Sequence, residues 1–293
     1  MKKAAMGSKT PAKPPWLKVR LPGSTRYHEL KRRSRQLGLS TVCEEARCPN
    51  IGECWGQGTS TFMIMGDICT RGCRFCAVKT RRHGQPLDPA EPQHLAQAIA
   101  EMDLDYAVIT SVDRDDLDDG GAAHFASCIE AIRLKSPKTK IEVLIPDFLG
   151  HEEHLRLVVN AHPEVIGHNI ETVKRLSPGI RDPRASYSLS LEVLSTIRRL
   201  NHAQRTKSSL MVGLGESEAE VRASLLDLRA VGVDLVAIGQ YLQPSKRHLE
   251  VVKYVSPEQF EVYRQMGMEI GFKYVASAPL VRSSYKASEG FAS

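Results

Sequence analysis

Strand-like and helix-like segments alternate along most of this chain, and this alternation constrains the fold more than any other feature of the sequence. The strand-like runs are short and rich in β-branched or apolar residues, and they span residues 61–65, 107–110, 141–145, 165–170, 210–212 and 235–238. Segments with a helical apolar period separate them, at residues 92–102, 122–135, 151–160, 189–203 and 217–231. Such alternation predicts parallel strands joined by right-handed crossovers.

The length of the alternating region favours an open barrel. Residues 61–239 leave room for about six βα units at roughly 30 residues each, whereas a closed eight-unit barrel usually takes about 250 residues. We therefore expect an α/β fold built on a partial, open parallel barrel of about six βα units. A doubly wound sheet would contain the same elements, and the preference for a barrel rests partly on the resemblance described below. The predicted divisions are a disordered basic arm at residues 1–22, an N-terminal Cys-rich extension at 23–60, the barrel at 61–255 and a C-terminal extension at 256–293.

Positive charge is concentrated at the N-terminus. Eleven Lys or Arg residues and one acidic residue precede residue 39, whereas the whole chain carries a formal net charge of +6. Such a basic arm can steer an acidic partner, or it can be a solvated leader. No basic and aromatic pattern recurs beyond the arm, which argues against nucleic-acid binding. The sequence has no run of about 18 apolar residues and no secretory signal, so we expect a cytoplasmic protein that does not bind membranes.

Six of the seven cysteines lie between Cys43 and Cys76. Disulfide scaffolds belong to short secreted chains, whereas clustered cysteines in a chain of this size indicate a metal site. The seventh cysteine, Cys128, lies in an apolar helical pattern, and we expect it to be a small buried hydrophobic residue.

Cys69, Cys73 and Cys76 form a C-x-x-x-C-x-x-C triplet directly after the first predicted strand. A cubane iron–sulfur cluster has four iron corners, so three thiolates leave one iron open to a substrate or cosubstrate. Zinc is the alternative, with His83 as the nearest fourth ligand, but structural zinc sites prefer paired C-x-x-C units. The spacing is similar to that of the radical S-adenosylmethionine superfamily.

Cys43, Cys48 and Cys54 form a second triplet, in a loop that precedes the predicted barrel. On their own, three cysteines in a loop are compatible with zinc binding or with redox chemistry. Beside a cluster loop they indicate a second iron–sulfur cluster that is available for a separate task.

Over residues 37–285 the chain closely resembles the lipoyl synthases. The motifs that carry the resemblance are C-E-E-A-R-C-P-N-I-G-E-C-W at residues 43–55, the cluster loop, T-S-V-D-R-D-D-L at 110–117, H-N-I-E-T-V at 168–173, G-L-G-E at 213–216 and R-S-S-Y at 282–285. The basic arm is interpreted as lying outside this resemblance.

The resemblance implies two [4Fe-4S] clusters and S-adenosylmethionine as cosubstrate. Members of this family insert sulfur at C6 and C8 of an octanoyl group on a lysine of a carrier protein, and an auxiliary cluster supplies the sulfur. Breaking an unactivated C–H bond needs cofactor chemistry, because no side-chain acid or base can do so. The implied partners are octanoylated lipoyl carrier domains such as E2 subunits and the glycine cleavage H protein, an electron donor such as ferredoxin or flavodoxin, and an iron–sulfur cluster donor.

The resemblance also implies roles for individual residues. The radical-forming cluster would bind to Cys69, Cys73 and Cys76. The auxiliary cluster would bind to Cys43, Cys48, Cys54 and Ser283, with Ser284 as the less favoured fourth ligand.

Polar residues at the ends of predicted strands are expected to face the cosubstrate, as in other parallel α/β folds. We assign Ser111 to its amino-acid end, Asn169 and Glu171 to its ribose, and Arg184 to its carboxylate. The aspartates between residues 113 and 119 do not fit a calcium loop, so we expect a solvated loop there, with Arg114 near the substrate.

Two rival interpretations stay open on the residues alone. Another radical enzyme, such as a biotin synthase or a methylthiotransferase, would share the cluster loop, but the Cys43 triplet and the R-S-S-Y motif at residues 282–285 argue against both. The other rival is a non-catalytic zinc protein that docks through its basic arm. Metal analysis separates the zinc protein from an iron–sulfur enzyme.

Overall fold

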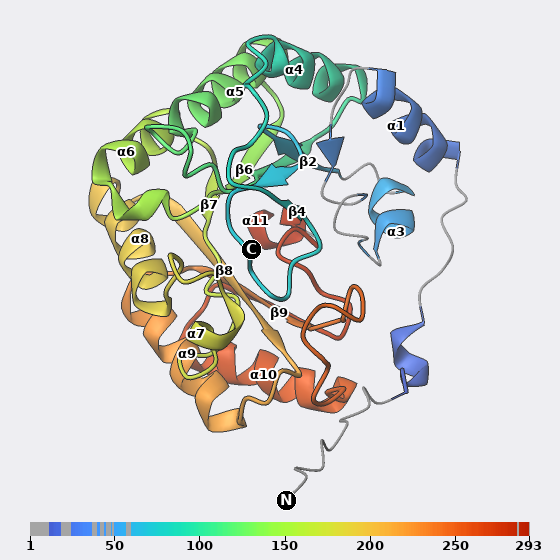
Figure 1. The fold of residues 1–293 in the computed structure, drawn as a ribbon, viewed down its shortest axis with the longest axis vertical. Coiled ribbons are helices and arrows are strands. Elements are labelled where there is room, and N and C mark those ends of the chain that lie inside the picture. Colours follow the sequence, from blue (N-terminus) through green and yellow to red (C-terminus); the bar gives the residue numbers. More distant parts are fainter. Residues whose placement is uncertain are drawn as a thin grey trace, which may run out of the picture.

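The computed structural model describes residues 12–18, 25–36, 40–41, 44, 48, 50–56, 60–285 and 287–292. The main sheet has the strand order β1-β2-β5-β6-β7-β8-β9-β10, in which β1 (Ser40–Thr41) runs antiparallel to β2. The other seven strands are parallel: β2 (Thr61–Ile64), β5 (Tyr106–Ser111), β6 (Lys140–Leu144), β7 (Val165–Gly167), β8 (Arg205–Val212), β9 (Leu235–Gln240) and β10 (Tyr274–Ser277). Within the described residues β10 pairs only with β9, so the expected open parallel barrel is confirmed (Figure 1).

Six βα units build the barrel, because a covering helix follows each of the main-sheet strands β2, β5, β6, β7, β8 and β9 (Figure 1). These helices are α4 (Glu91–Glu101), α5 (Ala122–Lys135), α6 (Glu152–Asn160), α8 (Tyr187–Leu200), α9 (Glu218–Ala230) and α10 (Pro257–Ile270). β10 continues the parallel sheet beyond residue 255, where the sequence analysis placed a domain boundary. The boundaries themselves stay predictions.

Shorter elements connect these units or precede and follow them. They are η1 (Pro15–Leu17), α1 (Thr25–Gln36), α3 (Ile51–Gly56), the parallel pair β3 (Ile68–Cys69) and β4 (Lys79–Thr80), η2 (Phe148–Gly150), α7 (Ser177–Ile180) and α11 (Ala287–Ala292). Most residues of the predicted basic arm lie outside the described residues. No helix among the described residues is long and apolar enough to cross a membrane.

Local sequence signals explain where several helices begin and end. The Ser217 hydroxyl accepts from the Glu220 N–H while the Glu220 carboxylate accepts from the Ser217 N–H, which is the capping box expected from the sequence. Ser256 caps α10 in a similar way. The same helix ends at Gly271, which adopts a left-handed conformation that glycine tolerates without steric cost.

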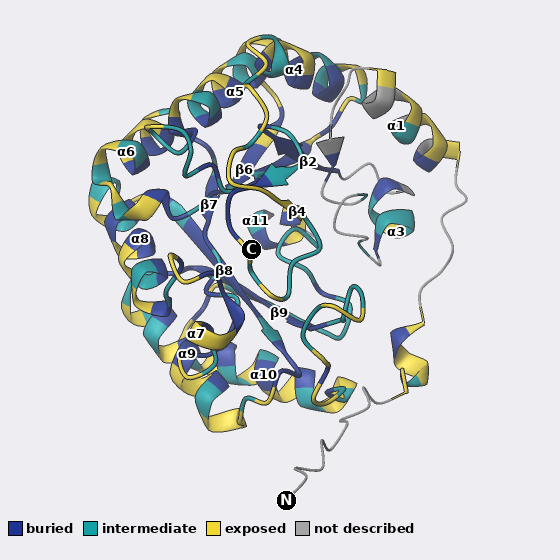
Figure 2. Cartoon of the chain, viewed as in Figure 1, coloured by how far each residue is buried: buried dark blue, intermediate teal, exposed yellow. Residues whose placement is uncertain are grey.

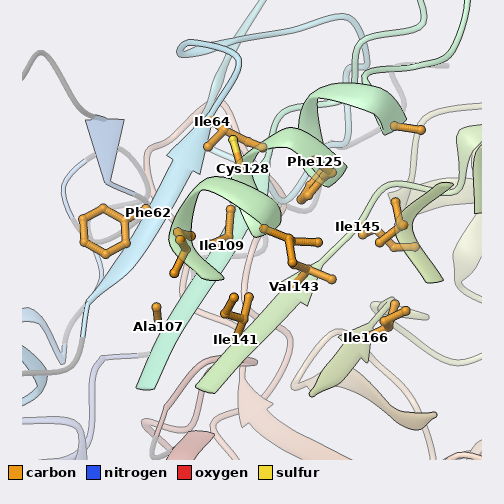
Figure 3. Close-up of a cluster of buried hydrophobic side chains, with 14 of the residues drawn as sticks. Phe62, Ile64, Ala107, Ile109, Phe125, Cys128, Ile141, Val143, Ile145 and Ile166 are labelled. Atoms are coloured by element: carbon orange, nitrogen blue, oxygen red, sulfur yellow. The ribbon is translucent and has the colours of Figure 1, made fainter. Parts of the chain in front are cut away.

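The hydrophobic core lies between the outer face of the sheet and the helices. Phe62, Ile109, Ile141 and Ile166 point from consecutive strands toward the helices, where Phe125 and other apolar side chains pack against them (Figure 3). Cys128 lies in this core and is fully buried, as expected from the sequence. Burial follows the same layers, since the strands are buried and the outer helix faces are exposed (Figure 2).

A buried polar cluster lies inside the barrel. The Tyr106 hydroxyl donates to the Glu142 carboxylate (2.7 Å), and the Lys207 ammonium donates to the other Glu142 oxygen (2.8 Å). The C-terminal helix α11 lies at the centre of the barrel in the view of Figure 1. Its Ala287 packs near Tyr106, and its Phe291 ring lies 6.0 Å from the Tyr106 ring. The barrel is therefore filled from within by its own C-terminal residues.

Candidate active site

The cluster loop, residues 69–78, is held against several strand ends. Met65 and Gly66, which follow β2, both have positive φ angles (66° and 83°), so the chain turns sharply before the loop begins. The Thr70 N–H donates to the Asp113 carbonyl oxygen (2.9 Å) after β5. His248, in the segment after β9, donates from Nε2 to the Cys76 carbonyl oxygen (2.9 Å). Segments far apart in the sequence thus fix the loop at both ends.

A cavity of about 270 Å³ opens beneath this loop. Most of the predicted site residues line it: Cys69, Cys73, Cys76, Ser111, Asn169 and Glu171. They come from the cluster loop and from the carboxyl ends of β5 and β7, as expected for ligand-facing residues of a parallel barrel. The structure therefore brings together residues that are more than 100 positions apart in the sequence.

Burial raises the pKa of all three thiols of the cavity. Burial raises the pKa of Cys69 to about 12, and the nearby Asp113 carboxylate adds to the rise. Burial also raises the pKa of Cys73 to about 12, partly offset by the Asp182 N–H that donates to its sulfur (3.3 Å). Thiolates in such a place need a cationic partner, which iron supplies when it displaces the protons. Among the described residues, no three His, Cys, Asp or Glu side chains lie close enough to hold a single metal ion.

Two buried polar atoms in the cavity wall fit the polar ends of a cosubstrate. Within the described part of the chain, the Ser111 hydroxyl and the Arg181 Nε make no hydrogen bond, although both residues line the cavity. Buried polar groups without partners are rare in native proteins, so a bound ligand is the expected partner. Asn169 donates to the Glu171 carboxylate (3.1 Å), whose pKa is raised by burial. The residues present therefore fit an iron cluster with an open corner and a polar cosubstrate beside it.

Arg71, which the sequence analysis did not single out, organises the charges under the loop. Its guanidinium makes paired hydrogen bonds to Asp115 (2.7 and 2.8 Å) and to Asp147 (2.6 and 2.7 Å), and its side chain is only 2% exposed. Asp113 lies 3.5 Å from the same guanidinium. Burial alone would raise the pKa of Asp147, but the hydrogen bonds and charge of Arg71 lower it overall. The position of Arg71 between two of the cysteines was the available signal.

Arg184 is placed differently from the sequence-based assignment. Its guanidinium donates to Asp182 (2.9 Å) and to the Thr70 carbonyl oxygen (2.7 Å), and it forms an ion pair with Asp115 (3.0 Å). It is not among the described residues that line the cavity, whereas Arg181 is. Arg184 thus supports the loop from outside, and its contact with the cosubstrate stays a prediction.

The expectation of a solvated loop at residues 113–119 is wrong for residues 113–116, whereas Asp118 is exposed as expected. The Asp115 and Asp116 side chains are 14% and 8% exposed, and both form ion pairs with buried arginines. Arg114 is one of these arginines: it donates to Asp116 (2.8 Å) and to the Met65 carbonyl oxygen (3.4 Å), so it supports the turn after β2 instead of facing the cavity. The partner of Asp116 is its near neighbour Arg114, whereas Asp115 is covered by Arg71 and Arg184 from distant segments that the local sequence does not show.

The second cysteine triplet meets the C-terminal R-S-S-Y segment. The Asn50 side chain, two positions after Cys48, donates to the Leu280 carbonyl oxygen (2.6 Å) across 230 residues of sequence. The Tyr285 hydroxyl donates to the Glu53 carboxylate (3.0 Å), next to Cys54.

Charge links the same two segments. Burial raises the pKa of Cys48, while the Asn50 N–H and the positive charge of Arg282 act in the opposite direction. Ser283 lies between Arg282 and Tyr285 in the sequence. The charge of Arg282 acts on Cys48, and the Tyr285 hydroxyl donates to Glu53, the neighbour of Cys54. Cys43 lies outside the described residues.

Two family models match parts of the chain. The family described as the radical SAM superfamily matches residues 63–228, and the family described as the N-terminal domain of lipoyl synthase matches residues 2–48. The second match includes the basic arm, so the interpretation that the arm lies outside the family resemblance is wrong.

Curated relatives match almost the whole chain. The lipoyl synthase of Myxococcus xanthus (strain DK1622) is 56% identical over 97% of this chain and 95% of its own length. The mitochondrial lipoyl synthase of Branchiostoma floridae is 54% identical over 97% of this chain and 77% of its own length.

Solved structures share the fold at low sequence identity. Streptococcus suis SuiB bound to S-adenosylmethionine has a TM-score of 0.58 at 9% identity, over 86% of this chain and 61% of that one. Methylornithine synthase (PylB) has a TM-score of 0.55 at 12% identity, over 85% of this chain and 81% of that one. At such identities the likeness shows the fold alone.

Proposed function

Because the chain belongs to the lipoyl synthase family of radical S-adenosylmethionine enzymes, we propose that it inserts two sulfur atoms, at C6 and C8, into a protein-bound octanoyl-lysine. One observation carries the proposal: three cysteine thiols line a cavity that also holds two buried polar atoms, and no described residue is a hydrogen-bond partner of either atom. When bound, a [4Fe-4S] cluster there supplies the electron that cleaves the sulfonium of S-adenosylmethionine and releases the hydrogen-abstracting radical.

The residues of the cavity wall would orient the cosubstrate and exclude water. Cys69, Cys73 and Cys76 would hold three irons and leave the fourth open. Ser111 would donate to the amino-acid end of the cosubstrate, and Asn169 and Glu171 would bind its ribose hydroxyls. The carboxylate contact expected of Arg184 fits Arg181 better, because Arg181 lines the cavity and its buried Nε has no partner among the described residues.

The second triplet would hold the cluster that is consumed as the sulfur substrate. Cys43, Cys48 and Cys54 would bind three of its irons and Ser283 the fourth. A hydroxyl ligand suits a cluster that must lose sulfide, because soft iron–sulfur clusters are held most firmly by thiolates. Support for Ser283 comes from its position between Arg282 and Tyr285, whose neighbours are Cys48 and Glu53.

The family implies lipoyl carrier proteins as acceptors. We further propose octanoylated E2 subunits and the glycine cleavage H protein as substrates, ferredoxin or flavodoxin as the electron donor, and an iron–sulfur cluster donor that rebuilds the consumed cluster. A cytoplasmic location also stays a prediction, because the relatives named above include a bacterial protein and one named mitochondrial.

The direct test is a single-turnover assay. Anaerobically reconstituted protein is incubated with an octanoyl-lysyl peptide, dithionite and S-adenosylmethionine, and the peptide is analysed by mass spectrometry. We expect a peptide that has gained two sulfur atoms; 5′-deoxyadenosine without sulfur in the peptide would favour a different radical enzyme. Metal analysis of the same protein should find about eight irons per chain, the sum of two cubane clusters, whereas zinc without iron would favour the zinc-binding rival.

A further inference from the structure

The C-terminal strap, residues 278–285, runs across the end of β9 on its way to the second cysteine triplet. The Ala278 N–H donates to the Ile238 carbonyl oxygen (3.3 Å), and the Gln240 N–H donates to the Pro279 carbonyl oxygen (3.2 Å). Backbone hydrogen bonds on either side of Gly239 therefore fix where the strap begins.

Gly239 leaves no room for a side chain at this crossing. A Cβ atom built on Gly239 would lie 2.1 Å from the Val281 carbonyl oxygen and 3.3 Å from the Arg282 Nη1. The nearest obstacle is backbone, which cannot rotate away as the end of a flexible side chain can. The strap thus occupies the space that a side chain at position 239 would need.

The strap is anchored on both sides of Val281. Directly before Val281, Asn50 donates to the Leu280 carbonyl oxygen (2.6 Å). After Val281, Tyr285 donates to Glu53 (3.0 Å), and α11 follows inside the barrel (Figure 1). The Arg205 guanidinium sits 4.8 Å above the Phe291 ring of α11 and donates to the Phe291 carbonyl oxygen. A displacement at Gly239 is therefore transmitted along a short segment that contains Ser283.

We propose that Gly239 is a positioning residue for the auxiliary cluster site. Because position 239 carries no side chain, the strap can lie close against the end of β9, and α11 holds the C-terminal end of the strap. Together these two features place Ser283 beside the second cysteine triplet. This inference rests on the proposed role of Ser283 as a cluster ligand. It assigns no contact with cosubstrate to Gly239, which is not among the described residues that line the cavity.

The geometry sets the size of the effect. To reach even 3.0 Å from an alanine Cβ, the Val281 carbonyl oxygen must withdraw by about 0.9 Å. Metal–ligand distances tolerate changes of only about 0.2 Å. A shift of this size two residues before Ser283 is therefore expected to break a bond between the Ser283 hydroxyl and iron. The three thiols of the cluster loop should keep their positions.

The test compares Gly239→Ala with Gly167→Ala in reconstituted full-length protein. Gly167 lies in the parallel strand β7, but a Cβ there would meet its neighbours at 3.5 Å or more, which is ordinary contact. Three quantities are measured: iron retained after a ferrous chelator is added, 5′-deoxyadenosine formed with dithionite, and sulfur inserted into an octanoyl-lysyl peptide. For Gly239→Ala we expect about four of eight irons to be lost and sulfur insertion to fall about 10- to 100-fold, with deoxyadenosine formation within about twofold of wild type. Gly167→Ala should match wild type in all three.

Ser283→Ala and the double variant separate this inference from the proposed function. If Gly239 acts through Ser283, the double variant retains as much iron as Ser283→Ala alone. Wild-type iron retention and sulfur insertion in Gly239→Ala, together with a defective Ser283→Ala, would overturn the inference and leave the ligand assignment intact. Wild-type behaviour of Ser283→Ala would instead overturn the ligand assignment.

Phe291→Ala is a second variant, and it adds no atom where Val281 passes Gly239. It removes the ring that packs against Tyr106 and Arg205, and so releases the far end of the strap. We expect selective loss of auxiliary iron here as well. Should Gly239→Ala not fold, full retention of eight irons in Phe291→Ala would overturn the proposal, and loss of about four would support it.

Discussion

The two cysteine regions differ in how the rest of the molecule holds them. The cluster loop at residues 69–78 is fixed by buried ion pairs and by backbone hydrogen bonds to the barrel. Among the described residues, the second triplet region is held by apolar packing of Cys48 and Cys54 against Tyr27 and Trp55, and by hydrogen bonds from residues 50–54 to the C-terminal strap, more than 200 residues away in sequence. A permanent cofactor benefits from a rigid site, whereas a cluster that is dismantled in each reaction cycle needs a site that can open. The difference in support therefore matches the difference in proposed task.

The largest expected effect comes from removing one cysteine from each region. Cys69→Ala should reduce both 5′-deoxyadenosine formation and sulfur insertion below detection, because without the first cluster no radical forms. Cys43→Ala should eliminate sulfur insertion while deoxyadenosine formation continues, because only the sulfur source is lost. Loss of both activities in a folded Cys43→Ala variant would contradict two separate tasks; chromatography of deoxyadenosine and mass spectrometry of the peptide measure them.

The next effect tests the rigidity of the cluster loop. Arg71→Met leaves Asp147 buried without its ion-pair partner and leaves Asp115 with Arg184 alone, and breaking such a buried pair typically costs about 3–5 kcal/mol of the free energy of unfolding. Urea unfolding of the metal-free protein measures it. The control is Arg175→Met, which removes an exposed ion pair with Glu220 and should leave the free energy of unfolding nearly unchanged. Equal stability of the two variants would show that the loop is less dependent on Arg71 than the contacts indicate.

The pH dependence of the free energy of unfolding tests the ion pair between Arg71 and Asp147. Burial alone would raise the pKa of Asp147, but Arg71 lowers it below the ordinary value of 3.8, so this ion pair stabilises the fold above about pH 4 and the contribution is lost as pH falls through the lowered pKa. In Arg71→Met burial still raises the pKa of Asp147 and the hydrogen bonds and charge of Arg71 no longer lower it, so protonation of Asp147 relieves more of the penalty as pH falls. The difference in unfolding free energy between wild type and variant should therefore narrow from pH 7 to pH 3. If the difference in unfolding free energy does not change with pH, the stability lost in Arg71→Met does not come from the charge of Asp147.

The smallest expected effect lies in the second region. Tyr285→Phe removes the hydrogen bond to Glu53, which should cost about 0.5–1.5 kcal/mol. We expect the auxiliary irons to be lost to a chelator a few times faster, with the other four irons unaffected. Tyr187→Phe is the matched control, because it removes a similar hydrogen bond, to Asp227 (2.9 Å), that joins α8 to α9 on the barrel surface. Equal iron loss in both variants would argue against a link between Tyr285 and the second triplet.

The sequence predicted the elements whose signals are local. The helix at residues 122–135 and the capping box at Ser217 agree with the structure, because periodicity and capping depend on near neighbours. β8 begins at Arg205 and not at residue 210, since its first residues include Arg205 and Lys207, which face a polar barrel interior and lack the apolar character of a buried strand.

Long-range contacts explain what the sequence analysis missed at the site. Arg71 looks like any loop arginine until Asp115 and Asp147 are brought beside it. Arg181 was passed over in favour of Arg184, because both follow the same short helix and only the fold determines which one lines the cavity. Gly239 carries no signal at all, because its importance comes from the Val281 backbone that crosses it.

The contact between Asn50 and Leu280 also sets an order of events during protein synthesis. The 230 residues between them take roughly 10–50 seconds to be made at typical rates of translation, and until then the second triplet has no strap to meet. Most of the groups that support the cluster loop, including Asp115 and Asp147, emerge from the ribosome well before that moment. The site at the second triplet is therefore expected to be completed after the cluster loop in the cell, although its cysteines are translated before those of the cluster loop.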